Sequence, residues 1–337
     1  MKKDLSIASV TLAYNSEQFL CGQLDALLRQ NRSLEEIIVV NNGSTDGTRD
    51  LLSAKYPQVT VLDLPTNVGV GGGYAAGLGY AARKHDWVWL LDHDSVPADD
   101  GLETLLQGLT GLEGSTESIG MLAPVPIHSG TQLSYPGMLW RRGWVRPRSE
   151  WSDQPVYFVD AVISSGSLIR SEVVDKVGLP RADFFIDFVD FEYCLRLRRH
   201  GYKIAVVRGS HLDHAIGNPR TINIFGYSKA WGGHAPWREY YISRNETFTI
   251  WSYFPDWKSK ISTLRRLLRH ATAIVAFGEQ KRTCLKMMLL GYLDGRAGRL
   301  GIRPLEGAPQ GITGCVPLPE VKSASEQLSS GARAERC

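Results

Sequence analysis

The 337-residue chain lacks the cysteine spacing of a metal-binding or disulfide-rich protein. It also lacks an apolar run long enough to span a bilayer, since the longest candidate near the C-terminus, ATAIVAFG, is too short. The opening MKKDLSIASV has neither the apolar core nor the cleavage site of a secretory signal. These absences predict a cytoplasmic protein without a disulfide framework. The five scattered cysteines, none in a Cys-x-x-Cys pair, are Cys21, Cys194, Cys284, Cys315 and Cys337.

Charge is nearly balanced in total but unevenly distributed. From Trp257 onward there are 14 Lys or Arg and 6 Asp or Glu, whereas residues 1–256 carry 24 basic and 29 acidic side chains. Between positions 258 and 303, 11 basic residues accompany only Glu279 and Asp294. A basic amphipathic helix of this kind can lie on an anionic membrane surface, and dimerisation through the same face is the alternative. No nucleic-acid-binding module accompanies the basic residues, so nucleic acid is not an expected partner.

Strand and helix patterns alternate over the first hundred residues. Strand patterns at 5–13, 35–42, 59–65 and 87–92 are separated by helix patterns at 16–30, 44–56 and 71–85. This alternation predicts an α/β fold with a mostly parallel central sheet flanked by helices. We expect residues 1–215 to form this domain, 216–303 a basic helical region, and 304–337, rich in Gly, Pro, Ser and Glu, a disordered tail.

Two carboxylates follow the buried strand pattern WVWLLD at one-residue spacing. Asp92 and Asp94 point to the same face of an extended chain, and such close like charges repel unless a positive group lies between them. They can cap the following helix, act as a hydrolytic acid and base, or bind a divalent cation shared with a phosphate-bearing ligand. Their position at the C-terminal edge of a sheet, where α/β proteins bind ligands, favours the cation.

A glycine-rich stretch, NVGVGGGYAAGLGYA, stands directly before and within a helix pattern. Its backbone N–H groups and helix N-terminus can face a phosphate group. The stretch is not a P-loop, because no Gly-Lys-Ser/Thr follows. It is also not a dinucleotide fingerprint, because the first strand-to-helix turn, LAYNSEQ, has no glycine. Tight packing of a helix is the alternative reason for the glycines.

These motifs together resemble a known enzyme family. VTLAYN, IIVVNNGSTDGT, NVGVGGGY, LLDHDSVP and FFIDFVDFEYCLRLRRHGYKI occur in the order and spacing of inverting GT-A glycosyltransferases. LDHDSVP, FFIDFVDFEYCLR and REYYISRN are most similar to bacterial rhamnosyltransferases that use dTDP-rhamnose, with galactofuranosyltransferases as near relatives. The resemblance runs from about residue 5 to 300. It implies a GT-A fold with a C-terminal helical extension, a nucleotide-sugar donor, and a glycan or lipid-linked glycan acceptor.

The resemblance also implies roles for individual residues. Asp92 and Asp94 would hold Mg²⁺ or Mn²⁺, with His214, rather than His211, as third ligand. Asp190 would be the general base, with the neighbouring acids as caps or supporting groups. Arg244 would contact phosphate, while the tyrosines beside it can equally pack in the core. The donor-binding residues implied are Thr11, Tyr14, Asn42, Asp46, Asn67, Gly71 and Asp92.

This chain departs from the family at the end of the second strand. Many relatives have Asp at position 41 or 42, whereas here both are Asn, which leaves the base identity open because an Asn carbonyl can also accept from uracil or thymine N3–H. Asn41 to Ser44 can also be a plain turn in which Ser44 caps a helix. A UDP-sugar-dependent galactofuranosyl or hexosyl transferase, and a catalytically silent nucleotide-sugar-binding scaffold, are the alternative functions, and a homo-oligomer is a possible state.

Overall fold

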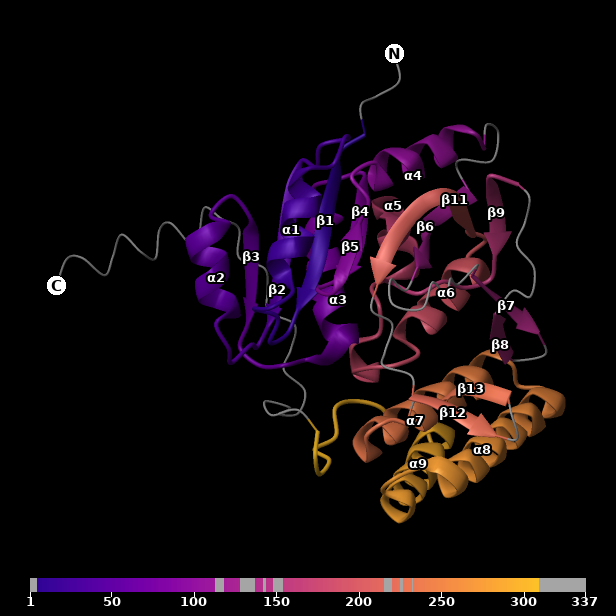
Figure 1. Ribbon diagram of the computed structural model, residues 1–337. Coiled ribbons are helices and arrows are strands. Elements are labelled where there is room, and N and C mark those ends of the chain that lie inside the picture. The colour runs from indigo at the N-terminus through magenta and orange to yellow at the C-terminus, as the bar shows by residue number, and fades with distance from the viewer. Residues whose placement is uncertain are drawn as a thin grey trace.

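The computed structural model describes residues 5–112, 118–127, 137–141, 144–147, 154–214, 220–224, 227–231 and 233–308 (Figure 1). Its strands are β1 (Ile7–Ala13), β2 (Glu36–Asn42), β3 (Thr60–Leu64), β4 (Trp87–Asp92), β5 (Ser95–Pro97), β6 (Ile119–Ile127), β7 (Met138–Arg141), β8 (Trp144–Pro147), β9 (Val156–Val159), β10 (Leu168–Arg170), β11 (Lys203–His214), β12 (Arg220–Ile224) and β13 (Tyr227–Trp231). Its helices are α1 (Leu20–Leu28), α2 (Thr48–Lys55), α3 (Gly69–Ala81), α4 (Gly101–Thr110), α5 (Ser171–Val177), the 3₁₀ turn η2 (Ala182–Phe184), α6 (Val189–Arg199), α7 (Pro236–Tyr253), α8 (Trp257–Phe277) and α9 (Lys281–Arg296).

A nine-stranded sheet forms the centre of the molecule. Its strand order is β3-β2-β1-β4-β10-β6-β11-β5, and β9 pairs with β11 beside this path. Strands β1 to β4 are parallel, which confirms the α/β prediction for the first hundred residues. The rest of the sheet is mixed, because the short β10 runs antiparallel between β4 and β6. Strand β11 is parallel to β6 but antiparallel to β5 and β9. The predicted α/β fold with a central sheet flanked by helices is confirmed, and the sheet is parallel from β3 to β4 and mixed beyond β4.

Helices cover both faces of the sheet. Alternate residues of the fully buried β1 point to opposite faces, so Ala8, Val10 and Leu12 join one apolar cluster while Ile7 and Ala13 join another. The first cluster packs beneath α3, α5 and α6, and the second beneath α1, α2 and α4. Buried continuous apolar strands of this kind are typical of sheets with helices on both sides.

The C-terminal helices lie together at one end of the sheet (Figure 1). Helix α7 packs along α9, and α8 packs against both. Two glycines of α9 permit this close approach, because a Cβ at Gly291 or Gly295 would lie 2.2 Å from the Tyr240 carbonyl oxygen or 2.3 Å from that of Arg244. The hairpin of β12 and β13 was not expected in this otherwise helical region. Within the described ranges, no helix is both long and apolar enough to cross a bilayer. Most of the predicted tail, residues 309–337, lies outside the described residues.

Candidate metal and catalytic centre

The two carboxylates and the histidine come together through one antiparallel strand pair. Strand β4 ends at Asp92, and β5 begins at Ser95 immediately after Asp94. Strand β5 pairs antiparallel with β11 in a register that places Ser95 opposite His214, the last residue of β11. A residue far along the sequence is thereby brought beside the carboxylate pair. The sequence preference for His214 over His211 agrees with this register.

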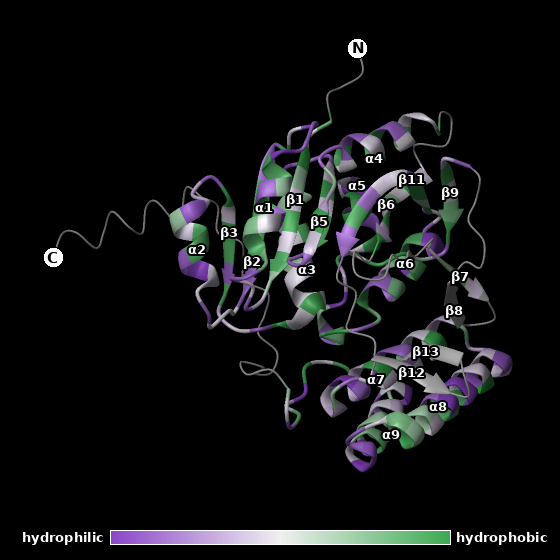
Figure 2. Ribbon diagram, in the orientation of Figure 1, coloured by the Kyte–Doolittle hydropathy of each residue, from purple (hydrophilic) through white to green (hydrophobic). Residues whose placement is uncertain are grey.

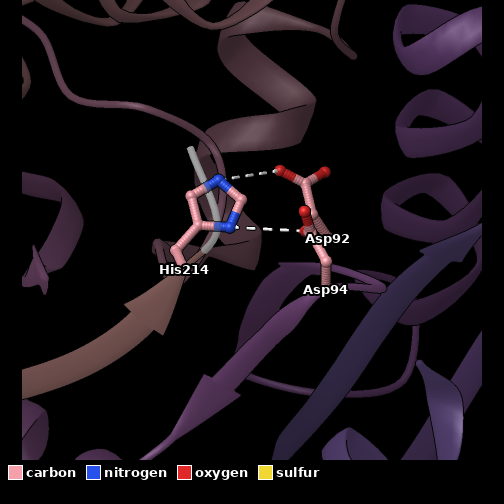
Figure 3. A group of neighbouring side chains, drawn as sticks. All are labelled: Asp92, Asp94 and His214. Carbon is pink, nitrogen blue, oxygen red and sulfur yellow. Dashed lines mark ion pairs between the residues drawn. The ribbon is translucent and has the colours of Figure 1, made fainter. Parts of the chain in front are cut away.

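The three side chains face one another (Figure 3). His214 Nε2 lies 3.8 Å from Asp92 Oδ2, and Nδ1 lies 3.3 Å from Asp94 Oδ1. One ligand atom from each residue falls within 4.8 Å of the other two. Ligand atoms about 2.1 Å from a Mg²⁺ ion lie roughly 3–4 Å from one another, so this spacing suits a single cation. The donor set fits a divalent ion, and an imidazole beside two carboxylates suits Mn²⁺ better than Mg²⁺.

The two carboxylates of this cluster favour positive charge beside them. Burial raises the pKa of Asp92, and the nearby Asp94 carboxylate adds to that rise. Burial also raises the pKa of Asp94, but its hydrogen bond to His214 and the charge of that residue outweigh burial and leave the pKa below the usual value. Burial lowers the pKa of His214, and the two carboxylates more than reverse this effect. A proton on His214 thus offsets the carboxylate repulsion, and a bound dication would take over that role.

A chain of hydroxyl groups orients the metal-site residues. Ser95 Oγ lies 2.7 Å from His214 Nδ1 and 2.6 Å from Ser165 Oγ, which also accepts the Asp92 backbone N–H at 3.1 Å. Both serines are almost completely buried. Because Ser95 contacts Nδ1, the ring presents Nε2 toward Asp92. Sequence reasoning missed both residues: Ser95 adjoins the Asp92–Asp94 motif and offered a signal, whereas Ser165 offered none.

Tyr74 was also missed, although it lies in the glycine-rich stretch. Its hydroxyl donates to Asp92 Oδ1 at 2.7 Å, and its side chain is 1% exposed. Gln23 of α1 supports the same turn from the other side, donating to the backbone carbonyls of Asp92 and Ser95. The carboxylates are therefore fixed by buried groups from both helical layers.

Asp190 lies in the first turn of α6 and shares the electrostatics of the metal site. Burial raises its pKa to about 7, and the carboxylates of Asp187 and Asp92 contribute to the rise. A carboxyl group with a pKa near neutrality can accept a proton from a substrate hydroxyl at physiological pH. Glu192 is instead completely buried and pairs with Arg196 at 3.0 Å, which agrees with the expected supporting role.

The segment just before Asp190 has an unusual backbone. Phe185, Asp187 and Phe188 all adopt positive φ angles of 61–66°, a region that side-chain-bearing residues rarely occupy. Arg238 holds this conformation through a bidentate pair with Asp187, with both N–O distances 2.9 Å. Asn245 Nδ2 adds bonds to the carbonyls of residues 184, 186 and 187 at 2.8–2.9 Å. Strain of this kind is typically retained at functional sites.

The glycine-rich helix is closely packed, and the N–H of Gly71, one of the predicted donor-binding residues, already has an acceptor. The Gly71 N–H donates to the Phe185 carbonyl at 3.1 Å, and a Cβ at Gly71 would lie 2.2 Å from the Arg181 carbonyl oxygen. Gly69 adopts φ +75° and meets Phe185 equally closely. The glycines allow the strained segment that precedes Asp190 to rest directly on the start of α3.

Arg244 is likewise not a phosphate contact in this structure. Its side chain is 0% exposed and donates to the backbone carbonyls of Asp183, Phe184 and Gly301. Every guanidinium nitrogen is used, since Nε donates to Asn245 Oδ1 at 2.8 Å. Helix α7 packs between the other C-terminal helices, which buries this arginine.

The predicted donor-binding residues differ in how accessible their side chains are. The Thr11 side chain is 0% exposed within β1, so direct contact with a donor is excluded in this conformation. Asn42 and Asn67 are 2% and 5% exposed and hydrogen-bond each other at 3.1 Å, and both bind the turn that begins α3. The contact of Asn42 and Asn67 with the donor stays a prediction. The same holds for the more accessible Tyr14 and Asp46. Asp46 also caps α2 by accepting from the Thr48 N–H and hydroxyl.

The Asn41 side chain has an acid beside it. Strand pairing places Asn41 opposite Asp63 of β3, and its amide donates to the Asp63 carboxylate at 2.9 Å. Asp63 also pairs with Arg49 of α2. This edge of the sheet therefore carries a carboxylate, which the neighbouring strand supplies.

The chain is similar to known glycosyltransferases in sequence. Residues 9–113 match the family model Glycosyl transferase family 2. The dTDP-rhamnosyl transferase RfbF of Shigella flexneri is 26% identical over 298 residues, which are 88% of this chain and 97% of that protein. Galactofuranosyltransferase GlfT1 of Mycolicibacterium smegmatis is 28% identical over 228 residues, which are 65% of this chain and 74% of that protein. The resemblance inferred from the motifs is confirmed.

Solved structures share the fold. GalNAc-T7 with UDP, GalNAc and Mn²⁺ has a TM-score of 0.55 at 15% identity, covering 74% of this chain and 48% of that chain. Staphylococcus aureus TarS 1–349 in complex with UDP has a TM-score of 0.53 at 15% identity, covering 92% and 100%. Residues 9–113 thus match Glycosyl transferase family 2, and the chain shares the GT-A fold of these solved structures.

Proposed function

We propose that the protein is a metal-dependent, inverting rhamnosyltransferase that uses dTDP-rhamnose. The acceptor would be a hydroxyl group of a cell-surface glycan or its lipid-linked precursor. The proposal is supported by the cluster of Asp92, Asp94 and His214, together with the buried Asp190 carboxyl, whose pKa of about 7 is raised by burial and in part by the Asp92 charge. Similarity to RfbF over 97% of its length supports rhamnose as the sugar and dTDP as the nucleotide.

The residues divide the chemistry between them. Asp92, Asp94 and His214 would hold Mg²⁺ or Mn²⁺, which when bound neutralises charge on the donor diphosphate and on the leaving group. Ser95 and Tyr74 hold two of these ligands in place through the contacts described above. Preorganised charge of this kind acts on the transition state without rearrangement.

Asp190 would act on the acceptor. Its carboxylate takes the proton of the acceptor hydroxyl while that oxygen bonds to the anomeric carbon of the sugar. The bond between the anomeric carbon and the diphosphate oxygen breaks on the opposite face, which inverts the configuration. No covalent enzyme intermediate is required. Arg238 and Asn245 would fix the distance between Asp190 and the donor by holding the strained segment before it.

Two other functions are alternatives to a dTDP-rhamnose-dependent transferase. Similarity to GlfT1 supports a UDP-galactofuranose donor, which would leave the metal site and the base unchanged. A silent nucleotide-sugar-binding scaffold would have no use for a carboxyl group tuned to about 7. The cell location stays a prediction, as does a homo-oligomeric state.

Calorimetric titration tests the proposal directly. The full chain is titrated with dTDP-rhamnose, UDP-galactofuranose and UDP-glucose, each with Mn²⁺, with Mg²⁺ and with a chelator. Metal-dependent binding of dTDP-rhamnose alone is the expected result, and Asp94→Ala should abolish the metal dependence. Asp175→Asn, an exposed acid on α5, is the matched control. Preference for a UDP-sugar would replace the proposed donor, and binding without turnover on any glycan acceptor would favour the scaffold.

A further inference from the structure

One face of α8 is apolar and exposed. Trp257 is 66% exposed, Ile261 37%, Leu264 43%, Leu268 67% and Val275 53%. The steps between these positions are four, three, four and seven residues, which align the side chains along one side of a helix. Large apolar side chains scattered singly over a surface are ordinary, but a continuous stripe marks an interaction site. We call these five residues the α8 stripe.

The orientation of α8 is fixed by its other side. Thr263, Leu267 and Ile274 are buried against the neighbouring helices. His270 Nε2 lies 2.7 Å from Glu239 Oε2 of α7, which anchors the middle of the helix. The inner face of α8 is thus packed against the protein, and the stripe lies on its outward side. Figure 2 shows hydrophobic and hydrophilic residues intermixed along α8.

Positive charge borders the stripe. Lys258, Arg265 and Arg269 are exposed and follow one another at seven- and four-residue steps, along one edge of the stripe. Helix α8 contains no Asp or Glu at all. Helix α9 repeats the composition on its exposed positions, where Leu289 and Leu293 are 57% and 43% exposed. Its exposed cations are Lys281, Arg282, Lys286 and Arg296, and its one acid, Asp294, is buried.

We propose that the α8 stripe lies on an anionic lipid bilayer, with the helix parallel to the surface. Apolar side chains would enter the acyl boundary while the bordering cations meet lipid phosphates, as in interfacial amphipathic helices. A second copy of the chain fits less well. A symmetric contact through this face would bring two sets of cations together, and α8 offers no acid to pair with them.

The same helices hold the segment that carries the general base, so the inference rests on the proposed function. Helix α7 binds residues 183–187 through Arg238, Arg244 and Asn245. A surface-bound helical region would therefore set the height of Asp190 above the bilayer. An acceptor hydroxyl presented on a lipid-linked glycan would reach the base at a defined distance.

Vesicle sedimentation of the full chain tests the surface. We expect binding to vesicles of phosphatidylcholine and phosphatidylglycerol, weaker binding to phosphatidylcholine alone, and weakening with added salt. The double variant Leu264→Ser/Leu268→Ser should lose about tenfold or more in vesicle affinity, because two apolar side chains that enter the bilayer on binding are removed. Arg265→Gln/Arg269→Gln should lose a similar factor on the anionic vesicles only. Leu28→Ser, at a 47% exposed position of α1, is the matched control and should bind as the parent does.

Two further measurements keep the outcomes apart. Donor calorimetry on the same variants should be unchanged, so loss of vesicle binding with intact donor binding would concern the surface and not the proposed reaction. Light scattering without lipid reports a second copy as the partner. A concentration-dependent dimer that Leu264→Ser/Leu268→Ser dissociates, absence of parent binding to either vesicle, or equal binding of parent and double variant would each overturn the proposal.

Discussion

The sheet domain and the C-terminal helices distribute polar residues in opposite ways. In the sheet domain, β1 is buried along its whole length and is apolar except for Ser9 and Thr11. In the C-terminal helices the interior itself is polar, while α8 turns large apolar side chains outward. The buried polar residues of α7 are Glu239, Ser243, Arg244, Asn245, Glu246, Thr247 and Thr249.

The contrast follows from what each region must hold. Parallel strands satisfy their own backbone groups and leave a polar edge for a ligand. The C-terminal helices instead hold the strained stretch 183–188, and Arg244 and Asn245 of α7 donate to its backbone carbonyls. Buried backbone carbonyls need partners, and these side chains provide them. Asp190, the proposed base, directly follows the segment at which these two regions meet.

The sharpest test of that meeting point is Asp190→Asn. We expect turnover to fall by about 10² to 10⁴, the usual contribution of a general base, while metal-dependent donor binding is retained. The parent should lose kcat/KM as the pH falls through about 7, because the carboxyl is then protonated. Asp190→Asn should lack this acid limb in its residual activity. Near-parental activity in the variant would remove Asp190 from the mechanism.

Stability supplies the control for the same variant. The folded pKa of Asp190 is about 7, above its ordinary value of 3.8, so the folded state binds the proton more tightly than the unfolded state. The free energy of unfolding therefore falls as pH rises from about 4 to about 7 through this group. Asp190→Asn lacks that loss and should be more stable than the parent at pH 8. Lower stability at pH 8 would mean that the activity loss reflects misfolding.

The polar interior of the C-terminal helices is tested by Arg244→Met. The change removes the guanidinium hydrogen bonds to the carbonyls of Asp183, Phe184 and Gly301, and each buried bond contributes about 0.5–1.5 kcal/mol. We expect denaturant unfolding to show a loss of about 3 kcal/mol. Arg265→Met, at an exposed position of α8, should stay within about 0.5 kcal/mol of the parent. Equal stability of the two variants would contradict the structural role of Arg244.

Sequence patterns predicted the regions where periodicity dominates. The alternation of strand and helix through residue 92 was correct because buried parallel strands carry continuous apolar runs. The pairing of His214 with Asp92 and Asp94 was also anticipated, but only through the family resemblance. Nothing local predicts that β5, three residues long, pairs with the end of β11. The short antiparallel β10 was missed for the same reason, since its direction is decided by tertiary pairing.

Residue roles were predicted less well where a side chain has two possible partners. Gly71 and Arg244 have the chemistry of phosphate contacts, but neighbouring backbone carbonyls use their donors first. The amide of Asn42 donates a hydrogen bond to the Asn67 side-chain oxygen. In each case the competing partner lies on a segment distant in sequence, often the strained stretch 183–188. Composition identifies a donor, and only the fold shows which acceptor lies within reach.

The next prediction concerns Ser95, at the polar edge of the sheet domain. Ser95→Ala removes the hydroxyl that contacts His214 Nδ1 at 2.7 Å and frees the ring to turn. Loss of an outer partner of this kind weakens metal affinity by about 10- to 100-fold. Mn²⁺ titration followed by electron paramagnetic resonance measures this without turnover. Ser53→Ala on the exposed side of α2 is the control, and binding of nucleotide in chelator should not change. An unchanged Mn²⁺ affinity would show that Ser95 does not orient the ligand.

The smallest expected effect concerns Tyr74, where the two helical layers meet the metal site. Its hydroxyl donates to Asp92 Oδ1, and burial together with the Asp92 charge raises the pKa of Tyr74 well above its ordinary value, so it remains a donor. Tyr74→Phe keeps the buried ring and removes one hydrogen bond, worth about 1 kcal/mol, or roughly fivefold in Mn²⁺ affinity. The same bond favours ionised Asp92, so the deficit should grow as pH falls. A deficit that is the same at every pH would mean that Tyr74 shapes the site by packing and not by holding Asp92 in its charged form.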